Sequence, residues 1–288
     1  MKELDVSDIE MNLLIEAIYQ RFQYDFRLYS RSSLKRRVGQ ALIQFRCQNI
    51  TQLQEKLLHD TDFFPKLLSY LTVNTTELFR DPEYYRSLRE RVFPFLQTYP
   101  SIKIWIAGCS TGEEVISMSI ILREMGITKY MIYATDINPM NLVRAQKAIY
   151  SNDVMKTATR NYQLSGGTGS LSDYYQSAYD SVQFDKTLLE KVVFSDHSLA
   201  TDEVFSEVHF VSCRNVLIYF ERPLQDKVLK LFSKSLSRNG FLGLGTKETI
   251  HFSSIAEDFK NLDVEQRIFQ KVEDLNLRVR DCTRGEII

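Results

Sequence analysis

Residues 1–71 carry apolar side chains at steps of three and four and contain almost no glycine. This spacing predicts amphipathic helices, because residues three and four apart share one helix face. We expect one helix capped by Asp5 or Ser7, a second that begins at Ser32 or Ser33, and two more capped by Thr51 and Asp62. The apolar positions of the first helix are Ile9, Leu13, Ile15, Ile18 and Phe22. The segment is predicted to be a small helical domain.

Pro82 favours the start of one more helix, from Glu83 to about Val92. Further along, alternating or continuous apolar runs predict strands. Residues 102–106 form one such run, which stops at Gly108, and Gly112 then leads into a helical pattern. A second run, 130–134, ends at Asp136. A glycine loop after one strand and a carboxylate after the next are typical of Rossmann-type folds, in which backbone N–H groups approach a nucleoside and the acid binds ribose hydroxyls.

The remaining elements alternate between helix and strand, as in an α/β fold. Helices are predicted at 138–148, with Leu142, Val143, Ala145 and Ala148 facing inward, and at 223–236. Further core strands are predicted at 192–194, 208–212 and 241–245, a closing pair at 262–264 and 268–271, a hairpin at 174–179 and 181–184, and a turn at Asn239–Gly240.

Polar side chains gather where these strands should end. Arg214, Asn215 and Tyr219 follow the strand at 208–212, and the polar segment 72–82 precedes the sheet. The carboxyl ends of parallel strands are where open α/β sheets bind ligands. The segment 72–82 has the composition of an ordinary linker, but its side chains Asn74, Thr76 and Arg80 could also reach a ligand held there.

The composition is that of a globular protein large enough for two domains, with 288 residues of which 44% are hydrophobic. No apolar run reaches the roughly 18 residues of a membrane span, and no signal peptide is recognisable, so we expect a cytoplasmic protein without membrane insertion. The four cysteines and four histidines are scattered, which suits reduced thiols and predicts no metal site. No hydrophobic oligomer stripe is evident, and a monomer is expected.

Basic residues are concentrated in the helical domain. Between Arg21 and Arg46, seven basic residues stand against one acidic residue, although the whole chain has a formal net charge of −1. A basic helix can be an ordinary solvated face. The asymmetry nevertheless favours an acidic macromolecular partner over general nucleic-acid binding, and we expect no nucleic-acid function.

Four motifs make a resemblance to a known family specific. They are NTTELFRD at 74–81, AGCSTGEE at 107–114, ATDI at 134–137 and CRNVLIYF at 213–220. In this order, after a basic helical segment, they resemble CheR-type chemotaxis receptor methyltransferases over residues 7–272. The resemblance implies an all-α receptor-facing domain at 1–71, a linker at 72–82 that contributes to the cofactor site, and a Rossmann-like methyltransferase domain at 83–272. It also implies an inserted β-subdomain at about 171–191. Residues 273–288, beyond the resemblance, form a charged tail by composition.

The activity that the resemblance implies is transfer of a methyl group from S-adenosylmethionine to glutamate side chains on the cytoplasmic helices of bacterial chemoreceptors, leaving S-adenosylhomocysteine. Arg80 and Tyr219 would then lie beside the transferred methyl group, Glu114 beside the cationic methionine end, and Asp136 on the ribose. The implied cofactor-binding residues are Asn74, Thr76, Arg80, Gly108, Glu114, Asp136, Ser198, Leu199, Arg214 and Asn215. Lys35, Arg36 and Arg37 would bind the receptor.

The chain departs from the family pattern at a few positions. Ser198 stands where asparagine is usual, so the contact with adenine is expected to differ. Val115 and Ile116 replace the usual proline and tyrosine, and the hairpin turn at 179–181 lacks glycine, which leaves tethering to a receptor C-terminal peptide open.

Three other functions deserve comparison with this one. A nicotinamide oxidoreductase is disfavoured because Gly108 and Gly112 lack the three-glycine spacing of that fold. A module that binds S-adenosylmethionine without transferring the methyl group would also fit the motifs. The third is the same O-methylation of a different acidic signalling protein.

Overall fold

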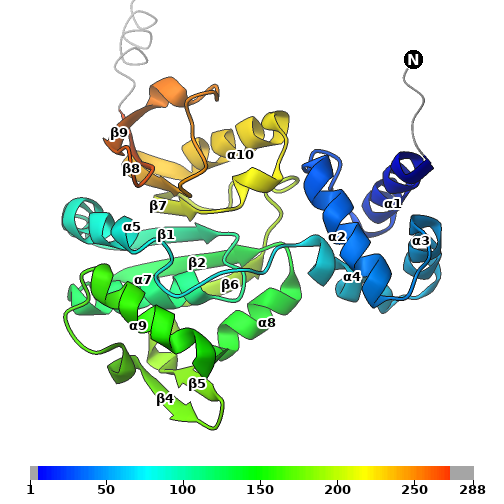
Figure 1. Ribbon diagram of the computed structural model, residues 1–288. Coiled ribbons are helices and arrows are strands. Elements are labelled where there is room, and N and C mark those ends of the chain that lie inside the picture. The colour runs from blue at the N-terminus through cyan, green and yellow to red at the C-terminus, as the bar shows by residue number, and fades with distance from the viewer. Residues whose placement is uncertain (1–5, 273–288) are drawn as a thin grey trace, which may run out of the picture.

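The structure, a computed structural model, describes residues 6–272, so the tail expected at 273–288 lies outside the described residues. The first domain consists of four helices, α1 (Val6–Phe22), α2 (Arg31–Gln44), α3 (Ile50–His59) and α4 (Phe63–Leu71). They pack around a core of their own, to one side of the sheet (Figure 1). The helical character predicted for this part of the chain is confirmed.

Some details of the helices differ from the sequence prediction. Ile9 and Leu13 of α1 are 46% and 54% exposed, because the buried side of α1 carries Met11, Leu14, Ile15 and Ile18 instead. The expected cap of α3 at Thr51 is wrong, since the side chain of Asn49 accepts the Gln52 N–H there. In α8 (Pro139–Lys147), Val143 was expected to face inward but is 46% exposed.

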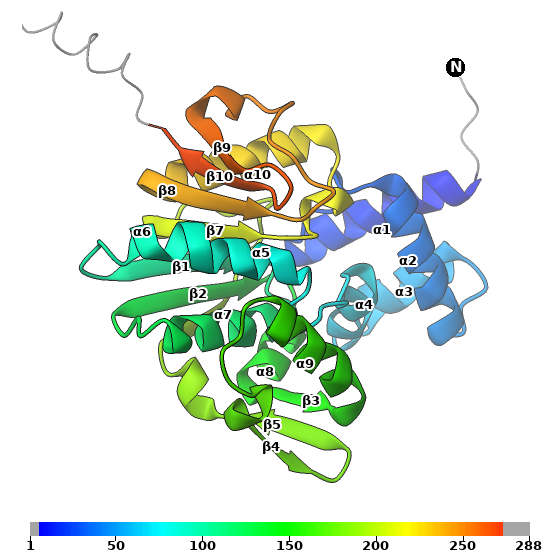
Figure 2. The same cartoon turned by 60° about the vertical axis from the view of Figure 1, so that its left-hand side comes forward.

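A sheet of seven strands forms the second domain, in the order β6-β2-β1-β7-β8-β10-β9. The first five in this order run parallel, whereas β10 is antiparallel to both of its neighbours. The strands are β1 (Ile102–Ala107), β2 (Tyr130–Asp136), β6 (Val192–Asp196), β7 (Val208–Cys213), β8 (Leu236–Leu244), β9 (Phe259–Asp263) and β10 (Ile268–Lys271). This Rossmann-like α/β arrangement confirms the predicted fold class (Figure 2).

Helices cover both faces of this sheet because successive side chains of a strand point to opposite faces. Ile104 and Ile106 of β1 pack in one core with α5 (Pro82–Ser87), α7 (Glu113–Glu124) and α9 (Met155–Leu164). Trp105 and Ala107 point the other way, into a core with α10 (Arg222–Ser235). A π-helical turn, η1 (Leu88–Val92), and the short α6 (Phe93–Leu96) continue α5.

Two predictions about the sheet need correction. Residues 192–194 lie in β6 at the edge of the sheet rather than in its core, and Val193 is 44% exposed. The turn expected at Asn239–Gly240 lies inside β8, where the register with β7 shifts. Asn239 has a φ of 57°, and the extra residues bulge out of the strand without ending it.

The β-subdomain is a separate sheet in the order β3-β5-β4. The strands β4 (Tyr175–Ala178) and β5 (Ser181–Phe184) form the antiparallel hairpin that the sequence predicts. β3 (Ile149–Ser151), which lies before the expected range 171–191, pairs with β5. A strand of three residues is too short to show a periodicity, so the sequence pattern does not reveal it.

We expect Gly243→Ala in β8 to destabilise the protein. A Cβ atom at this position would lie 2.1 Å from the hydroxyl oxygen of Tyr84, a buried side chain whose hydroxyl is 2.8 Å from Ser212 Oγ. Overpacking of this kind costs about 1–3 kcal/mol, which denaturant unfolding would measure. Adding Tyr84→Phe, which removes the hydroxyl, should recover part of the loss. An unchanged free energy of unfolding for Gly243→Ala alone would contradict this packing.

Candidate functional site

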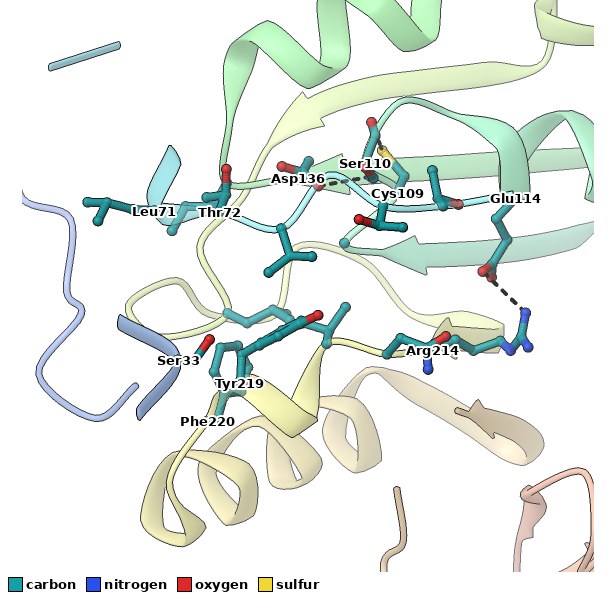
Figure 3. A pocket seen from close by; sticks show the side chains of 18 of the residues that line it. Ser33, Leu71, Thr72, Cys109, Ser110, Glu114, Asp136, Arg214, Tyr219 and Phe220 are labelled. Carbon is teal, nitrogen blue, oxygen red and sulfur yellow. Dashed lines mark hydrogen bonds and ion pairs between the residues drawn. The ribbon is translucent and has the colours of Figure 1, made fainter. Parts of the chain in front are cut away.

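The strand order reverses at β1, with β2 and β6 on one side and β7 and β8 on the other. In open α/β sheets, ligands bind at the carboxyl ends of the strands beside such a reversal. A cavity opens at this place, between the ends of β1, β2 and β7 and the helical domain (Figure 3). Ser33 of α2 and Tyr219 of the second domain both line it.

Most of the predicted site residues line this one cavity. They are Thr76, Arg80, Gly108, Glu114, Asp136, Leu199, Arg214, Asn215 and Tyr219. Ser198 lies instead in a smaller neighbouring cavity, and His197 lines both. Asn74 does not line either cavity, and its side-chain oxygen accepts a 2.8 Å hydrogen bond from Asn141 Nδ2 of α8.

The glycine loop after β1 can turn sharply because its residues adopt left-handed backbone conformations. Gly108 has a φ of 76° and Gly112 a φ of 93°. A Cβ on Gly108 would also lie 2.5 Å from a side-chain methyl carbon of Val216, so a larger residue would clash. The N–H groups of Gly108 and Cys109 both donate to the carbonyl oxygen of Thr135, at 2.8 Å. The loop therefore follows the end of β2, where Asp136 lies.

Asp136 is buried and holds this corner of the cavity together. Its Oδ2 accepts the Ser110 N–H at 2.9 Å, and its Oδ1 accepts the Asn138 N–H at 2.9 Å and Asn141 Nδ2 at 3.1 Å. Burial raises the pKa of Asp136, and these hydrogen bonds partly offset the increase. A carboxylate offers about four lone-pair sites, so Oδ2 can still accept a hydroxyl group of a ligand.

An ion cluster around the buried Arg214 lies at the other end of the cavity. The Arg214 side chain is 2% exposed, and its Nη2 lies 2.6 Å from Asp81 Oδ2 while its Nη1 lies 3.7 Å from Glu114 Oε2. Its guanidinium also lies 4.1 Å from the centre of the Tyr84 ring. Glu114 accepts a further hydrogen bond from Ser212 Oγ at 2.5 Å. Two carboxylates around one guanidinium leave a net negative charge, which favours a cationic ligand.

The linker places Arg80 at the cavity through an unusual backbone. Phe79 and Asp81, on either side of Arg80, have φ values of 52° and 58°. Such conformations are costly for non-glycine residues and need support from the surroundings. The Phe79 N–H donates to Ser117 Oγ of α7 at 2.9 Å, and Arg214 Nη2 donates to the Arg80 carbonyl oxygen at 3.0 Å. Arg80 Nη1 lies 3.4 Å from the Thr75 carbonyl oxygen.

Two family descriptions match the chain. The all-alpha domain of CheR methyltransferases matches residues 9–72, and the S-adenosylmethionine-binding domain of CheR methyltransferases matches residues 74–268. The chain belongs to the CheR methyltransferase family. The resemblance drawn from the motifs is therefore confirmed, and the protein is an S-adenosylmethionine-dependent methyltransferase.

Several curated proteins are similar over most of their length. A Pseudomonas putida protein named Cher3 is 53% identical over 266 residues, which cover 92% of this chain and 97% of that protein. A chemotaxis protein methyltransferase of Listeria monocytogenes is 26% identical over 85% of this chain and 92% of its own. That of Klebsiella aerogenes is 28% identical over 90% of this chain and 88% of its own.

The cavity of this CheR family member fits S-adenosylmethionine. Glu114 and Asp81 supply negative charge near Arg214, where the ammonium and sulfonium groups of the cofactor would find compensation. Within residues 6–272, the buried polar atoms Ser110 Oγ, Ser198 Oγ and His197 Nδ1 have no hydrogen-bond partner in the protein, so they can bind a ligand. Asp136 retains an acceptor site for a ribose hydroxyl. The donor and acceptor groups thus suit a cationic nucleoside.

Between residues 6 and 272, no group of three or more histidine, cysteine, aspartate or glutamate side chains is arranged to hold a metal ion. Among the helices of that range, none combines the length and apolar character needed to cross a bilayer.

The motifs did not identify Glu248, which supports the segment carrying Asn215 and Tyr219. This side chain is 4% exposed. Its Oε2 accepts the Gly245 N–H at 2.6 Å and the Asn215 N–H at 3.0 Å, and its Oε1 accepts the Ile218 N–H at 3.3 Å. An acid three residues after the predicted strand 241–245 is the sequence signal that could have pointed to it.

We expect Glu248→Gln to weaken both stability and cofactor binding. The amide group retains only one acceptor oxygen for these backbone N–H groups, and an unpaired buried N–H costs about 1–3 kcal/mol. Denaturant unfolding and calorimetric binding of S-adenosylmethionine would measure the two effects. Lys247→Gln, which changes the exposed neighbour, is the control. Equal behaviour of the two variants would show that the carboxylate does not support this segment.

Proposed function

We propose that this chain methylates glutamate carboxylates on the cytoplasmic helices of a bacterial chemoreceptor, with S-adenosylmethionine as donor. The observation that supports this most is that Arg80 and Tyr219 line the same cavity as Glu114 and Asp136. A carboxylate-binding group thus lies near a pocket suited to a cationic methyl donor. The chemotaxis names of the Listeria and Klebsiella relatives support the receptor as acceptor.

The reaction requires little acid or base catalysis by the protein. An ordinary glutamate has a pKa of about 4.3, so at neutral pH it is already an ionised nucleophile. The bound cofactor supplies an electrophilic methyl group, which passes to a carboxylate oxygen as its bond to sulfur breaks, giving a methyl ester and S-adenosylhomocysteine without proton transfer. Positioning and exclusion of water remain as the contributions of the protein, and alignment can be worth up to roughly 7–11 kcal/mol.

Arg80 is the side chain that we assign to orient the incoming carboxylate. Within the described range 6–272, its guanidinium makes no ion pair with an acidic side chain of the protein, in contrast to the cluster around Arg214. Its positive charge is therefore not neutralised by an ion pair within the protein. Tyr219, which lines the same cavity from the segment after β7, would flank the reacting atoms.

The receptor would dock on α2. Arg36 is exposed and Arg37 is half-buried on this helix, while Lys35 Nζ is already paired with Asp8 Oδ1 at 2.5 Å. The same helix lines the cavity with Ser33. The basic surface and the cavity are thus less than two helical turns apart. An acidic receptor helix bound to α2 would bring its glutamates close to Arg80.

Transfer of labelled methyl groups to chemoreceptor-bearing membranes tests the proposal directly. Mild alkali hydrolyses a glutamate methyl ester and releases the label as methanol. Alkali-labile label on the receptor would support the proposed reaction. Label on another acidic protein would keep the chemistry but change the acceptor. Cofactor binding without label on any acceptor would instead indicate a sensing module.

We expect Arg80→Ala to lower kcat by about ten- to a hundredfold while the Kd for S-adenosylmethionine changes much less. The reason is that misplacing one reactant by about 1 Å can cost a hundredfold in rate, even when binding persists. Steady-state kinetics and calorimetry separate the two quantities. Arg160→Ala, which removes an exposed arginine of α9, controls for the charge change. Equal losses of kcat and cofactor affinity would argue against the assignment.

Replacing Lys35, Arg36 and Arg37 together by glutamine should weaken receptor binding by about tenfold at low ionic strength, since each exposed ion pair is worth roughly 0.2–1 kcal/mol. The remaining affinity should also depend less on salt, because fewer charges interact across the interface. Binding to receptor fragments across a salt series measures both effects. Neutralising Lys147, Lys156 and Arg160 gives the same charge change elsewhere on the surface. If both triple variants bind alike, α2 lies outside the interface.

A further inference from the structure

Tyr29, in the segment between α1 and α2, packs against the cores of both domains. Its ring meets Phe26 of the helical domain at a centroid distance of 4.8 Å and Phe220 of the methyltransferase domain at 4.8 Å. Both contacts are edge-to-face, the geometry that aromatic pairs prefer. Tyr29 also lines the cofactor cavity together with Phe220. The ring therefore joins the helical core to the cavity wall.

Backbone hydrogen bonds reinforce this contact. The Ser30 N–H donates to the Tyr219 carbonyl oxygen at 2.8 Å, and the Glu221 N–H donates to the Leu28 carbonyl oxygen at 2.8 Å. Together they form a short antiparallel bridge between Tyr29 and Phe220. The helical domain thus holds the backbone of Tyr219 itself, the residue assigned to flank the reacting atoms.

We propose that this bridge is a clamp through which the helical domain positions Tyr219 for methyl transfer. The inference rests on the proposed function, because it takes the catalytic role of Tyr219 from there. It assigns Tyr29 and the Ser30 N–H as positioning groups, which act through Tyr219 and Phe220. The helical domain then has two tasks, since it binds the receptor and completes the catalytic site.

The segment 215–220 is also held from within the methyltransferase domain. Glu248 holds Asn215 and Ile218 from within the methyltransferase domain, and Gln225 Nε2 donates to the carbonyl oxygens of Leu217 and Phe220 at 3.0 Å. The Tyr219 carbonyl oxygen receives its hydrogen bond across the domain boundary. A small shift of the helical domain would therefore move Tyr219 more directly than it moves Asn215.

The receptor-facing helix continues directly from the clamp. Ser30 directly precedes α2, Ser33 lines the cavity one turn later, and Arg36 and Arg37 follow on the same helix. A helix is stiff over so short a distance. Force applied to the basic side chains of α2 is thus transmitted to the hydrogen bond between Ser30 and Tyr219, so receptor docking and the position of Tyr219 are linked.

Proline substitutions can remove each hydrogen bond of the clamp separately. Ser30 has φ −52° and Glu221 has φ −72°, both close to the value that proline requires. Ser30→Pro deletes the donor to Tyr219, and Glu221→Pro deletes the donor to Leu28. Ser30→Ala and Glu221→Ala are the matched controls, because they change the side chain and retain the N–H group.

Each proline variant of the full chain should lower kcat by about two- to tenfold relative to its alanine control, the range expected for one hydrogen bond. The Kd for S-adenosylmethionine should match that of the control, because the clamp positions Tyr219 without binding the cofactor. Amide hydrogen exchange at residues 217–220 should become faster; residue 221 is left out because proline has no amide hydrogen. Equal kcat values for the proline and alanine variants, or parallel losses of kcat and cofactor affinity, would overturn the proposal.

The exchange measurement separates this inference from the proposed function, because it needs no acceptor. If the wild-type chain methylates no receptor, the proposed function fails, and faster exchange at 217–220 in both proline variants would still show that the bridge holds the segment of Tyr219 in place. If methyl transfer proceeds but exchange there is unchanged in both variants, the clamp is disproved while the function stands. Should one variant fail to fold, the other tests the same bridge from the opposite strand.

Discussion

The cofactor cavity depends on keeping one buried guanidinium compensated. Arg214 is almost fully buried and contacts Asp81 of the linker and Glu114 of α7. Breaking a buried ion pair by removing one partner costs about 3–5 kcal/mol, so the three side chains must stay together. They come from three distant segments, and the cluster therefore fixes the linker, the start of α7 and the end of β7 around one space. The cluster has one more negative than positive charge, which favours a cationic ligand in the cavity.

Hydrogen bonds to neighbouring elements make the linker part of the site. A polar segment between two domains could have been a passive connection, but here Asn74 bonds to α8, Phe79 bonds to α7, and the Arg80 carbonyl accepts from Arg214. These contacts offset the cost of the left-handed backbone on both sides of Arg80. The two domains are thus held at a defined distance, and the helical domain forms a wall of the cavity with Tyr29 and Ser33.

Elements with a strong period were predictable, and elements without one were not. The strand 102–106 and the helix after Gly112 follow from local patterns, since each contains enough apolar residues to define a face. The three-residue strand β3 does not. Ile9 and Leu13 were expected to be buried but are exposed. Apolar spacing predicts a helix, but it does not tell which face of that helix the other helices will cover. The bulge at Asn239 was mistaken for a turn because the same left-handed residue types serve both.

Local motifs were enough to indicate the glycine loop, Glu114, Asp136 and Arg80 as candidate site residues, because the residue types and their spacing are visible along the chain. How these groups are supported depends on the packing of distant segments. Asn74 bonds to α8, and Arg214 contacts Asp81 and Glu114 besides lining the cavity. The bridge between Tyr29 and Phe220 could not be read from the chain, because nearly two hundred residues separate them and no local pattern records such a contact. Interactions of this kind exist only when the packed domains bring distant segments together.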